Sequence, residues 1–309
     1  MNNEQSIYDY LYQYDQSSLI VYEPTGIYGK IMEKVCNNLG LCAYYVHPND
    51  MQSMMSIVWS KNKTDKCDAY HIAHIWCLLH QQSIQGNNNK LIKVNSNTMN
   101  QICAYLTQIH FMKQQIKKLK QGIEVEHSNA YHTHSHILYQ SLIDQIKAWI
   151  QEFENKIIEE FETMWMKQHF DTLQSIPCVG KVVALELVCF FGQLQAKGLK
   201  KEDTKKVVAY AWLNPVQKES WSSIRWSYLS RKWNSHVRCA LYMTWVQRIK
   251  QSKVEKYAHT NIALFTQRIS QKFSSPWSKR WKSIACAVSR KILCIAWSMF
   301  HTWYWYNFA

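Results

Sequence analysis

The stretch Ser18-Leu19-Ile20-Val21-Tyr22-Glu23-Pro24-Thr25-Gly26 decides the fold class of the first part of the chain. Its short apolar run with β-branched residues predicts a buried strand, and the Pro-Thr-Gly that follows predicts a turn. We expect a helix over about 28–39, closed by Gly40, and a second strand over about 41–46. Strands that alternate with helices predict a sheet covered by helices, and therefore an α/β fold. The other helices expected here span about 6–14, 49–57 and 64–82.

Residues 95–168 are predicted to be helical, apart from a polar connection at about 124–135. Apolar residues recur there at gaps of three or four in two stripes, which is typical of a helical hairpin or coiled coil and places Trp149 in the core. Four histidines near the connection could bind a metal, but we favour a solvated loop because no second ligand cluster has a matching spacing. The stripes are Ile102, Leu106, Ile109, Met112, Ile116, Leu119 and Ile123, then Leu142, Ile146, Trp149, Phe153, Ile157, Phe161 and Met164; the histidines are His127, His132, His134 and His136.

Residues 169–309 are predicted to be mostly helical, and they begin with a Pro177-x-x-Gly180 turn before an apolar helix at about 182–191. Such a turn fits a helix-hairpin-helix, whose backbone N–H groups grip a DNA phosphate, and it fits a plain interhelical turn equally well. The stretch 214–238 is polar and basic, with interleaved Ser and Trp, which favours phosphate contacts over a merely solvated face. The candidate nucleic-acid-binding residues are Lys181, Lys218, Arg225, Arg231, Lys232 and Arg238.

The charge balance points to a polyanionic partner. The chain has 36 Lys and Arg against 22 Asp and Glu, a net charge of +14. No run of 18 apolar residues occurs, mean hydropathy is −0.35, and the first residues lack the regions of a signal peptide, so we expect no membrane span. The ten cysteines contain no C-x-x-C pair, which fits reduced thiols in the cytoplasm better than a disulfide framework or a zinc site.

Three carboxylates are candidates for a metal site. Glu23 ends the first predicted strand, while Asp65 and Asp68 share one face at the start of a helix. Carboxylate oxygens that converge on one point can hold Mg²⁺, which polarises a phosphate and activates a nucleophile. The alternative is that aspartates in a first helical turn only complement the helix dipole.

Several short motifs follow one another near both ends of the chain, and their order and spacing are informative together. Glu23-Pro24-Thr25-Gly26 and Tyr28-Gly29 precede Lys63-Thr64-Asp65-Lys66-Cys67-Asp68-Ala69. The later motifs are Ile176-Pro177 with Gly180, Ala209-Tyr210-Ala211 with Leu213 and Pro215, Ser220, Leu229-Ser230, Asn234, Arg238, Lys282, Ala285 and Arg290-Lys291. Together they resemble the IS-one-ten family of insertion-sequence transposases, and the resemblance covers nearly the whole chain.

The resemblance implies a ribonuclease-H/RuvC-like domain at 1–94, a coiled-coil helical insertion at 95–168 and a serine transposase domain at 169–309. It assigns Glu23, Asp65 and Asp68 as the second, third and fourth acids of a Mg²⁺ site. Ser220 is the implied nucleophile, with Ser222 and Ser223 close enough to be confused with it. The serine attacks a DNA phosphate and forms a covalent intermediate, so that strand exchange proceeds by two transesterifications. The acids and the serine form a composite site across subunits, which implies a homodimer or homotetramer, and a structured guide RNA pairs with the DNA.

The chain departs from the family at its start. The family's first acid lies on an opening strand well before the Glu-Pro-Thr-Gly turn, whereas 22 residues precede Glu23 here and they match the helix after that strand. We therefore expect the first strands to be missing, which would leave Ser18–Tyr22 as an apolar edge.

Tryptophan also stands where the family has glycine. The chain has 8 Gly and 14 Trp, whereas usage of about 7% predicts roughly 22 Gly. Our hypothesis is that UGA codes for Gly in the source organism and was translated as Trp; the alternative is a Trp-rich surface that stacks bases. The candidate positions are Trp59, Trp212, Trp221, Trp226, Trp233 and Trp281.

Two other functions stay open at this point. A chain without the first acid predicts a catalytically inactive remnant that still binds nucleic acid. A coiled-coil scaffold with a basic tail is the third possibility, but it leaves the motifs at both ends of the chain unexplained.

Overall fold

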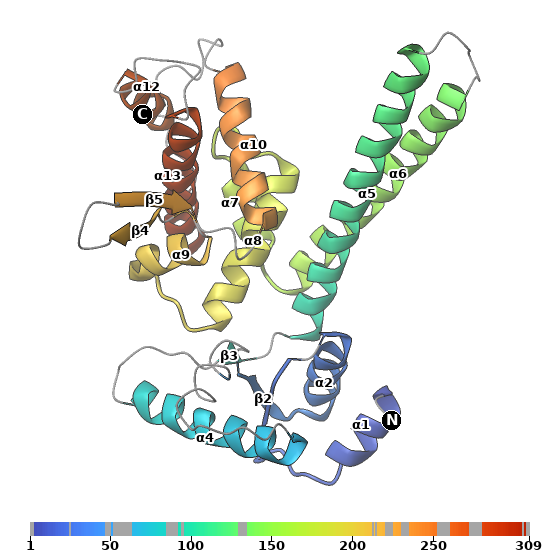
Figure 1. The fold of residues 1–309 in the computed structure, drawn as a ribbon, viewed down its shortest axis with the longest axis vertical. Helices are drawn as coiled ribbons and strands as arrows, with labels where there is room; N and C mark the ends of the chain where they lie inside the picture. Colours follow the sequence, from blue (N-terminus) through green and yellow to red (C-terminus); the bar gives the residue numbers. More distant parts are fainter. Residues whose placement is uncertain are drawn as a thin grey trace. The chain divides into compact units, whose positions relative to one another are not determined.

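The protein is mostly helical and was analysed as a computed structural model (Figure 1). It divides into two compact units, Met1–Gln101 with Gln193–Gly198, and Ile102–Gly192 with Leu199–Ala309. The structure describes residues 3–24, 26–46, 51, 64–84, 92–93, 96–128, 135–211, 213, 215–219, 225–229, 235–251, 260–271, 280–304 and 306.

The first unit is built on a small mixed sheet. Strand β1 (Leu19–Tyr22) pairs in parallel with β2 (Cys42–Tyr45), with Leu19 opposite Cys42. Helix α2 (Gly26–Leu39) connects them, as parallel strands require a crossover. The short β3 (Ile92–Lys93) pairs antiparallel with β2, giving the order β1-β2-β3. The expected strands and the α/β character are confirmed, while β3 was not predicted because two residues carry no periodic signal.

Two helices complete this unit. Helix α1 (Glu4–Leu11) is capped by Asn3, whose side chain accepts a hydrogen bond from the amide of Ser6. Helix α4 (Asp65–Ile84) packs on β1. The helix predicted over 49–57 falls, apart from Met51, outside the described residues. The core consists of Leu11, Val35, Cys36, Leu41 and Ala43, all with exposures of 5% or less.

A helical hairpin dominates the middle of the chain. Helices α5 (Asn97–Ser128) and α6 (Ser135–Thr163) lie side by side in Figure 1, and the rings of Tyr105 and Phe153 meet across them with centroids 5.3 Å apart. In α5 the predicted stripe is buried or half-buried throughout.

The stripe predicted for α6 is wrong at two positions. Trp149 is 54% exposed and Leu142 is 44% exposed, whereas their neighbours Ile150 and Ile143 are buried. Ile143, Ile150 and Ile157 are seven residues apart and form the real seam. The sequence was ambiguous because both members of each adjacent pair are apolar, and a strict seven-residue spacing selects the isoleucines.

The second unit is packed around one long helix. Helix α13 (Arg280–Thr302) contacts α7 (Lys167–Gln174), α9 (Thr204–Tyr210), α10 (Ser235–Gln251) and α12 (Asn261–Gln271). Its Trp297 is fully buried and meets the ring of Phe191, from α8 (Lys181–Ala196), edge-on. The indole nitrogen of Trp297 donates to the Lys201 carbonyl at 3.1 Å, in the 3₁₀ turn η1 (Lys201–Asp203).

A β-hairpin interrupts this helical unit. Strands β4 (Pro215–Glu219) and β5 (Arg225–Leu229) pair antiparallel, with Glu219 opposite Arg225. The sequence analysis predicted only a polar, basic stretch here. The hairpin was missed because β4 has one apolar side chain besides its proline and shows no alternation, while the alternation of Trp226 and Tyr228 in β5 covers only two apolar residues.

One helix is long and apolar enough to cross a membrane. The segment Ser283–Thr302 of α13 has a mean hydropathy of 1.4 over its most apolar window, and 56% of that window is buried inside the protein. Helices α8 and α9 pass the same test only as a pair bent by 119°. Because the core helix of a water-exposed domain has the same composition, α13 does not indicate a membrane protein.

Two residues after the end of helix α6, a tryptophan adopts a backbone conformation that is normally found for glycine. Trp165 has φ 58, in the left-handed region. The amide of Met166 donates to the Phe161 carbonyl at 2.8 Å, and the amide of Trp165 donates to the Glu162 carbonyl at 3.2 Å. This pattern usually places glycine at the left-handed position. Helix α2 ends with the same pattern, and there the residue is Gly40, with φ 70.

Helix α13 ends in a related way. Trp303 has φ 62, and its amide donates to the Met299 carbonyl at 2.9 Å. Trp165 is 86% exposed and Trp303 is 44% exposed. Both therefore join the candidates for misread glycine. Of the six original candidates, Trp226 lies in β5 and Trp281 in α13, where no left-handed backbone is required, and the backbones of the other four fall outside the described residues.

Replacing Trp165 by glycine is expected to stabilise the protein. The left-handed backbone costs a bulky L-residue about 1 kcal/mol, and an 86% exposed side chain contributes little packing. Urea unfolding should show the midpoint of Trp165→Gly rising. Trp149→Gly, in the middle of the same helix, is the matched control and should lower the midpoint. A lower midpoint for Trp165→Gly would contradict the assignment.

The histidines around α13 are expected to make the protein acid-sensitive. Burial lowers the pKa of His169 and that of His301, and the neighbouring His301 lowers the His169 pKa further. A folded-state pKa below the unfolded value of 6.5 means that the unfolded chain binds more protons as pH falls. Stability should therefore be lost as pH falls through about 6.5. Burial also lowers the pKa of His236, so this residue adds to the same loss.

The measurement is the drop in melting temperature between pH 7.5 and pH 5.5. His169→Phe keeps a ring stacked against Phe300, whose centroid is 4.1 Å away, but cannot be protonated. Its drop should be smaller than that of the parent protein, and an equal drop would show that His169 does not contribute.

Candidate active site

A cavity of about 590 Å³ in the first unit lies between β1 with the residue that follows it and one face of α4. All three carboxylates named in the sequence analysis line it. The lining residues are Leu19, Val21, Tyr22, Glu23, Asp65, Asp68, Ala69, Ile72, Ala73, Trp76 and Cys77.

The turn after β1 positions Glu23. Glu23 directly follows the strand, at the carboxyl end of a parallel pair, where ligand sites in α/β folds usually lie. Gly26 needs its left-handed φ of 52, and a Cβ on Gly29 would come within 3.1 Å of the Pro24 backbone. The two glycines therefore allow the turn to fold tightly against the start of α2.

The start of α4 positions the two aspartates. The Thr64 hydroxyl accepts a hydrogen bond from the amide of Cys67 at 3.3 Å, which caps the helix. Asp65 and Asp68 occupy the first turn, where the helix dipole favours negative charge. Asp68, Ile72 and Trp76 are four residues apart, so one face of the helix lines the cavity.

Two buried polar atoms in this wall lack a partner among the described residues. They are Oδ1 of Asp68 and the indole nitrogen of Trp76. A buried carboxylate oxygen without a hydrogen bond is costly, and coordination of a cation or a bound ligand removes that cost. Carboxylate oxygens are hard donors, so the chemistry of this set suits Mg²⁺, although the described side chains do not converge on one point in this structure. Over the residues that the structure describes, no three His, Cys, Asp or Glu side chains are gathered closely enough to hold a metal ion.

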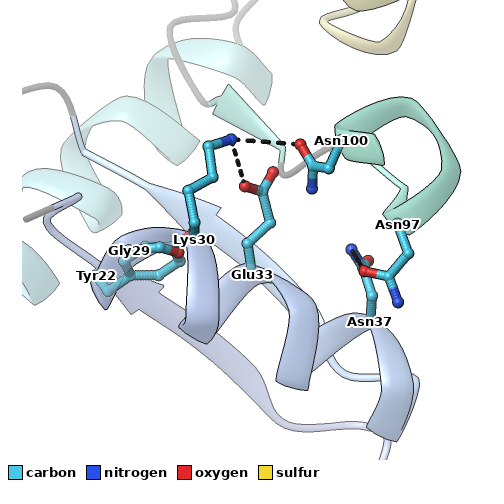
Figure 2. A network of polar contacts seen from close by, with 7 residues as sticks. All are labelled: Tyr22, Gly29, Lys30, Glu33, Asn37, Asn97 and Asn100. Carbon is cyan, nitrogen blue, oxygen red and sulfur yellow. Dashed lines mark hydrogen bonds and ion pairs between the residues drawn. The ribbon is translucent and has the colours of Figure 1, made fainter. Parts of the chain in front are cut away.

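A polar network ties α2 to the start of α5 (Figure 2). The Lys30 ammonium pairs with the buried Glu33 carboxylate at 2.8 Å and donates to the Asn100 side chain at 3.3 Å. Burial raises the pKa of Tyr22, and the Glu33 charge raises it further. Tyr22 therefore stays a neutral phenol, which donates to the Gly29 carbonyl at 3.4 Å and holds the turn.

The structure describes some of the predicted nucleic-acid-binding residues but not all of them. The Lys181 ammonium lies 3.5 Å from a Glu154 carboxylate oxygen and donates to Asn155 at 3.0 Å, so it is engaged within the protein. Lys218 and Arg225 belong to the hairpin strands, and Arg238 is half-buried on α10. Arg231, Lys232 and the serines Ser220, Ser222 and Ser223 lie outside the described residues.

The turn at Pro177 to Gly180 joins α7 and α8, as predicted. Cys178 has φ 76, and the amide of Val179 donates to the Ile176 carbonyl at 3.0 Å, which makes the connection compact. The choice between a DNA-gripping hairpin and a plain turn stays a prediction. Of the four histidines near the α5–α6 connection, His132 and His134 lie outside the described residues. His136 pairs with the buried Glu126 at 3.4 Å.

The excess of positive over negative charge lies at the end of the chain. Residues 1–219 contain 21 Lys and Arg and 21 Asp and Glu, while residues 220–309 contain 15 Lys and Arg and a single acid, Glu255. The whole net charge of +14 thus resides in the last 90 residues. This distribution favours a polyanion at the C-terminal segment rather than at the acidic cavity.

Sequence reasoning missed Trp76 and Tyr22 as parts of the cavity wall. Trp76 could have been found, because it follows Asp68 by eight residues and so shares its helical face. Tyr22 could not, since the alternation of a four-residue strand does not say which face meets the helix.

Two family models match the chain. A transposase model named for the DEDD domain of IS110 elements matches residues 2–89, and the model of the transposase IS116/IS110/IS902 family matches residues 171–259. No curated protein matches it. The models describe DNA transposases, and the DEDD domain indicates the use of a divalent metal. Since both ends of the chain match models of one family, the protein belongs to the IS110 family of insertion-sequence transposases.

Proposed function

We propose that this transposase cuts and rejoins DNA through Ser220 together with a Mg²⁺ site formed by Glu23, Asp65 and Asp68. The observation that carries the proposal is the placement of all three matched carboxylates along one cavity, with a buried Asp68 oxygen that has no partner among the described residues. Only one of the three carboxylates adjoins a strand and the other two begin a helix, so their shared wall is not a consequence of sequence proximity.

The residues have distinct roles in this proposal. Glu23, Asp65 and Asp68 would hold Mg²⁺, which when bound stabilises negative charge on the phosphate. The Ser220 hydroxyl gives up its proton as its oxygen bonds to the phosphorus, the P–O bond to one DNA strand breaks, and the departing oxygen takes up one proton. A hydroxyl of the second strand then attacks the phosphoserine diester, which restores the serine. The Trp76 N–H can donate to a phosphate oxygen or a base at the cavity wall.

The same proposal includes the domain organisation, the oligomeric state and the nucleic-acid partners. We propose a ribonuclease-H/RuvC-like domain at 1–94, a coiled-coil insertion at 95–168 and a serine transposase domain at 169–309, acting as a homodimer or homotetramer on nucleoid DNA. The single acid among the last 90 residues suits a segment that contacts DNA and a structured guide RNA. Lys218, Arg225, Arg231, Lys232 and Arg238 all lie in or next to this segment. Lys181 would have to leave Glu154 to contribute.

The test is the covalent intermediate. The full chain, incubated with Mg²⁺, the RNA transcribed from the element's non-coding flank and end-labelled donor and target DNA, should yield labelled protein that survives denaturing electrophoresis. DNA binding without labelled protein or joined products would favour the competing function, a catalytically inactive remnant. The same assay on a chain with glycine at the candidate tryptophans separates a misread sequence from an inactive one.

A further inference from the structure

A groove in the second unit is lined by residues to which no role has been assigned so far. Its volume is about 540 Å³, and it is bordered by α12, α13 and the residues that follow α13. Volumes of roughly 300–1,000 Å³ are typical of sites for small organic groups. The lining residues are Asn261, Leu264, Phe265, Arg268, Lys291, Ile295, Met299, Tyr304 and Tyr306.

Two cations from different helices converge on one aromatic ring in this groove. The Arg268 guanidinium carbon lies 5.8 Å from the centroid of Phe265, and the Lys291 ammonium lies 5.8 Å from the same centroid. Both distances are within the range of a cation–π contact. Both cations therefore lie beside one aromatic ring, where a ligand in the groove can reach them.

The groove is a positive site without a compensating acid. Arg268 and Lys291 are exposed, and neither forms an ion pair within the part of the chain that the structure describes. No Asp or Glu lines the groove, and none occurs in the sequence after Glu255. An anionic ligand would therefore meet attraction without local repulsion.

Apolar and aromatic surface is exposed beside the cations. Leu264 is 51% exposed and Tyr304 is 76% exposed, and both line the groove. The occupant must therefore combine a flat apolar face with negative charge. An unpaired nucleotide has both, because its base stacks on aromatic rings and its phosphate pairs with Lys or Arg. A base pair inside a duplex cannot offer its face in this way.

We propose that this groove binds single-stranded nucleic acid, with one base against Phe265 or Tyr304 and the adjoining phosphate at Arg268 and Lys291. The inference goes beyond the proposed function, because it needs neither the acids nor Ser220. It gives the transposase a place to hold an unpaired strand outside its catalytic residues.

The first test measures stacking by fluorescence anisotropy. The full chain is titrated with labelled oligo(dT) and oligo(rU) of about 12 nucleotides, and with an abasic strand of equal length and charge. The unaltered protein should bind both base-bearing strands more tightly than the abasic strand. Phe265→Leu keeps the groove apolar but removes the ring, so its affinity for the base-bearing strands should fall about 10-fold while that for the abasic strand changes little.

The second test uses two neighbouring charges. Lys291→Gln removes a groove cation, whereas Arg290→Gln removes an equal charge one residue away on α13, outside the groove. We expect Lys291→Gln to lower the slope of log affinity against log salt by about 0.7, with a smaller effect for Arg290→Gln. Thermal melts establish that each variant is folded.

Three results would overturn the proposal: equal affinity for abasic and base-bearing strands, equal losses for the two charge variants, or tighter binding of duplex DNA that also depends on Phe265. Asp68→Asn should bind the oligonucleotides like the parent protein. An inactive acid site therefore leaves the groove test intact, and loss of the groove leaves the covalent-intermediate test meaningful.

Discussion

Asp68→Asn should abolish strand exchange while the protein stays folded. The change keeps the shape of the side chain but removes the charge that a Mg²⁺ ligand needs. Metal-assisted charge stabilisation contributes several kcal/mol to such a transition state, so the rate of joined-product formation should fall more than about 100-fold. A buried carboxylate oxygen without a partner among the described residues also costs folding free energy, so the variant should be at least as stable as the parent in urea.

Metal binding gives this prediction a readout besides activity. A cation that binds the folded protein raises its melting temperature, so added Mg²⁺ should stabilise the parent protein and have less effect on Asp68→Asn. Asp144→Asn is the matched control, because Asp144 is an exposed carboxylate on α6 and its loss should change neither activity nor the Mg²⁺ response. An active Asp68→Asn, or an equal Mg²⁺ response in both variants, would remove Asp68 from the site.

Ser220→Ala should eliminate the covalent protein–DNA intermediate. Without its hydroxyl the residue has no oxygen to bond to phosphorus, and the loss of a catalytic nucleophile lowers rates by more than about 1,000-fold. DNA and oligonucleotide binding should persist, since the side chain contributes no charge. The measurement is labelled protein on a denaturing gel, together with the yield of joined strands.

The neighbouring serines provide the controls for this prediction. Ser222→Ala and Ser223→Ala remove the same hydroxyl at positions that the family motif does not match, and both variants should still form the intermediate. If Ser222→Ala or Ser223→Ala instead loses it while Ser220→Ala is active, the nucleophile has been assigned to the wrong serine. If all three form the intermediate, the chemistry depends on a different residue.

Much of the first unit could be predicted from local sequence. The strands at Leu19–Tyr22 and Cys42–Tyr45 and the helix between them follow from apolar runs and the glycines that end them. The two aspartates share a helical face because they are three residues apart. That this face meets the end of β1 could not be predicted, since it depends on packing between segments more than 40 residues apart in the sequence.

The second unit was less predictable because its signals are ambiguous. In α6 the buried Ile150 follows another apolar residue, Trp149, and the sequence alone does not say which of the two faces the core. Trp149 was therefore predicted to be in the core although it is exposed. In the β4–β5 hairpin only β5 alternates, through Trp226 and Tyr228, and two apolar residues are too few to predict a strand pair. The groove at Phe265 is lined by residues of both α12 and α13. No sequence motif includes residues of both helices, so the groove could not be predicted.

The left-handed tryptophans have a consequence that reaches past this protein. A helix terminus of the kind seen at Trp165 is specified by backbone hydrogen bonds and surrounding packing, and it favours glycine at the left-handed position whatever residue the sequence has there. Bulky residues that repeatedly occupy glycine's backbone region across the proteins of one genome would therefore report that genome's codon meanings. Backbone conformations can therefore be used to test which amino acid a codon encodes.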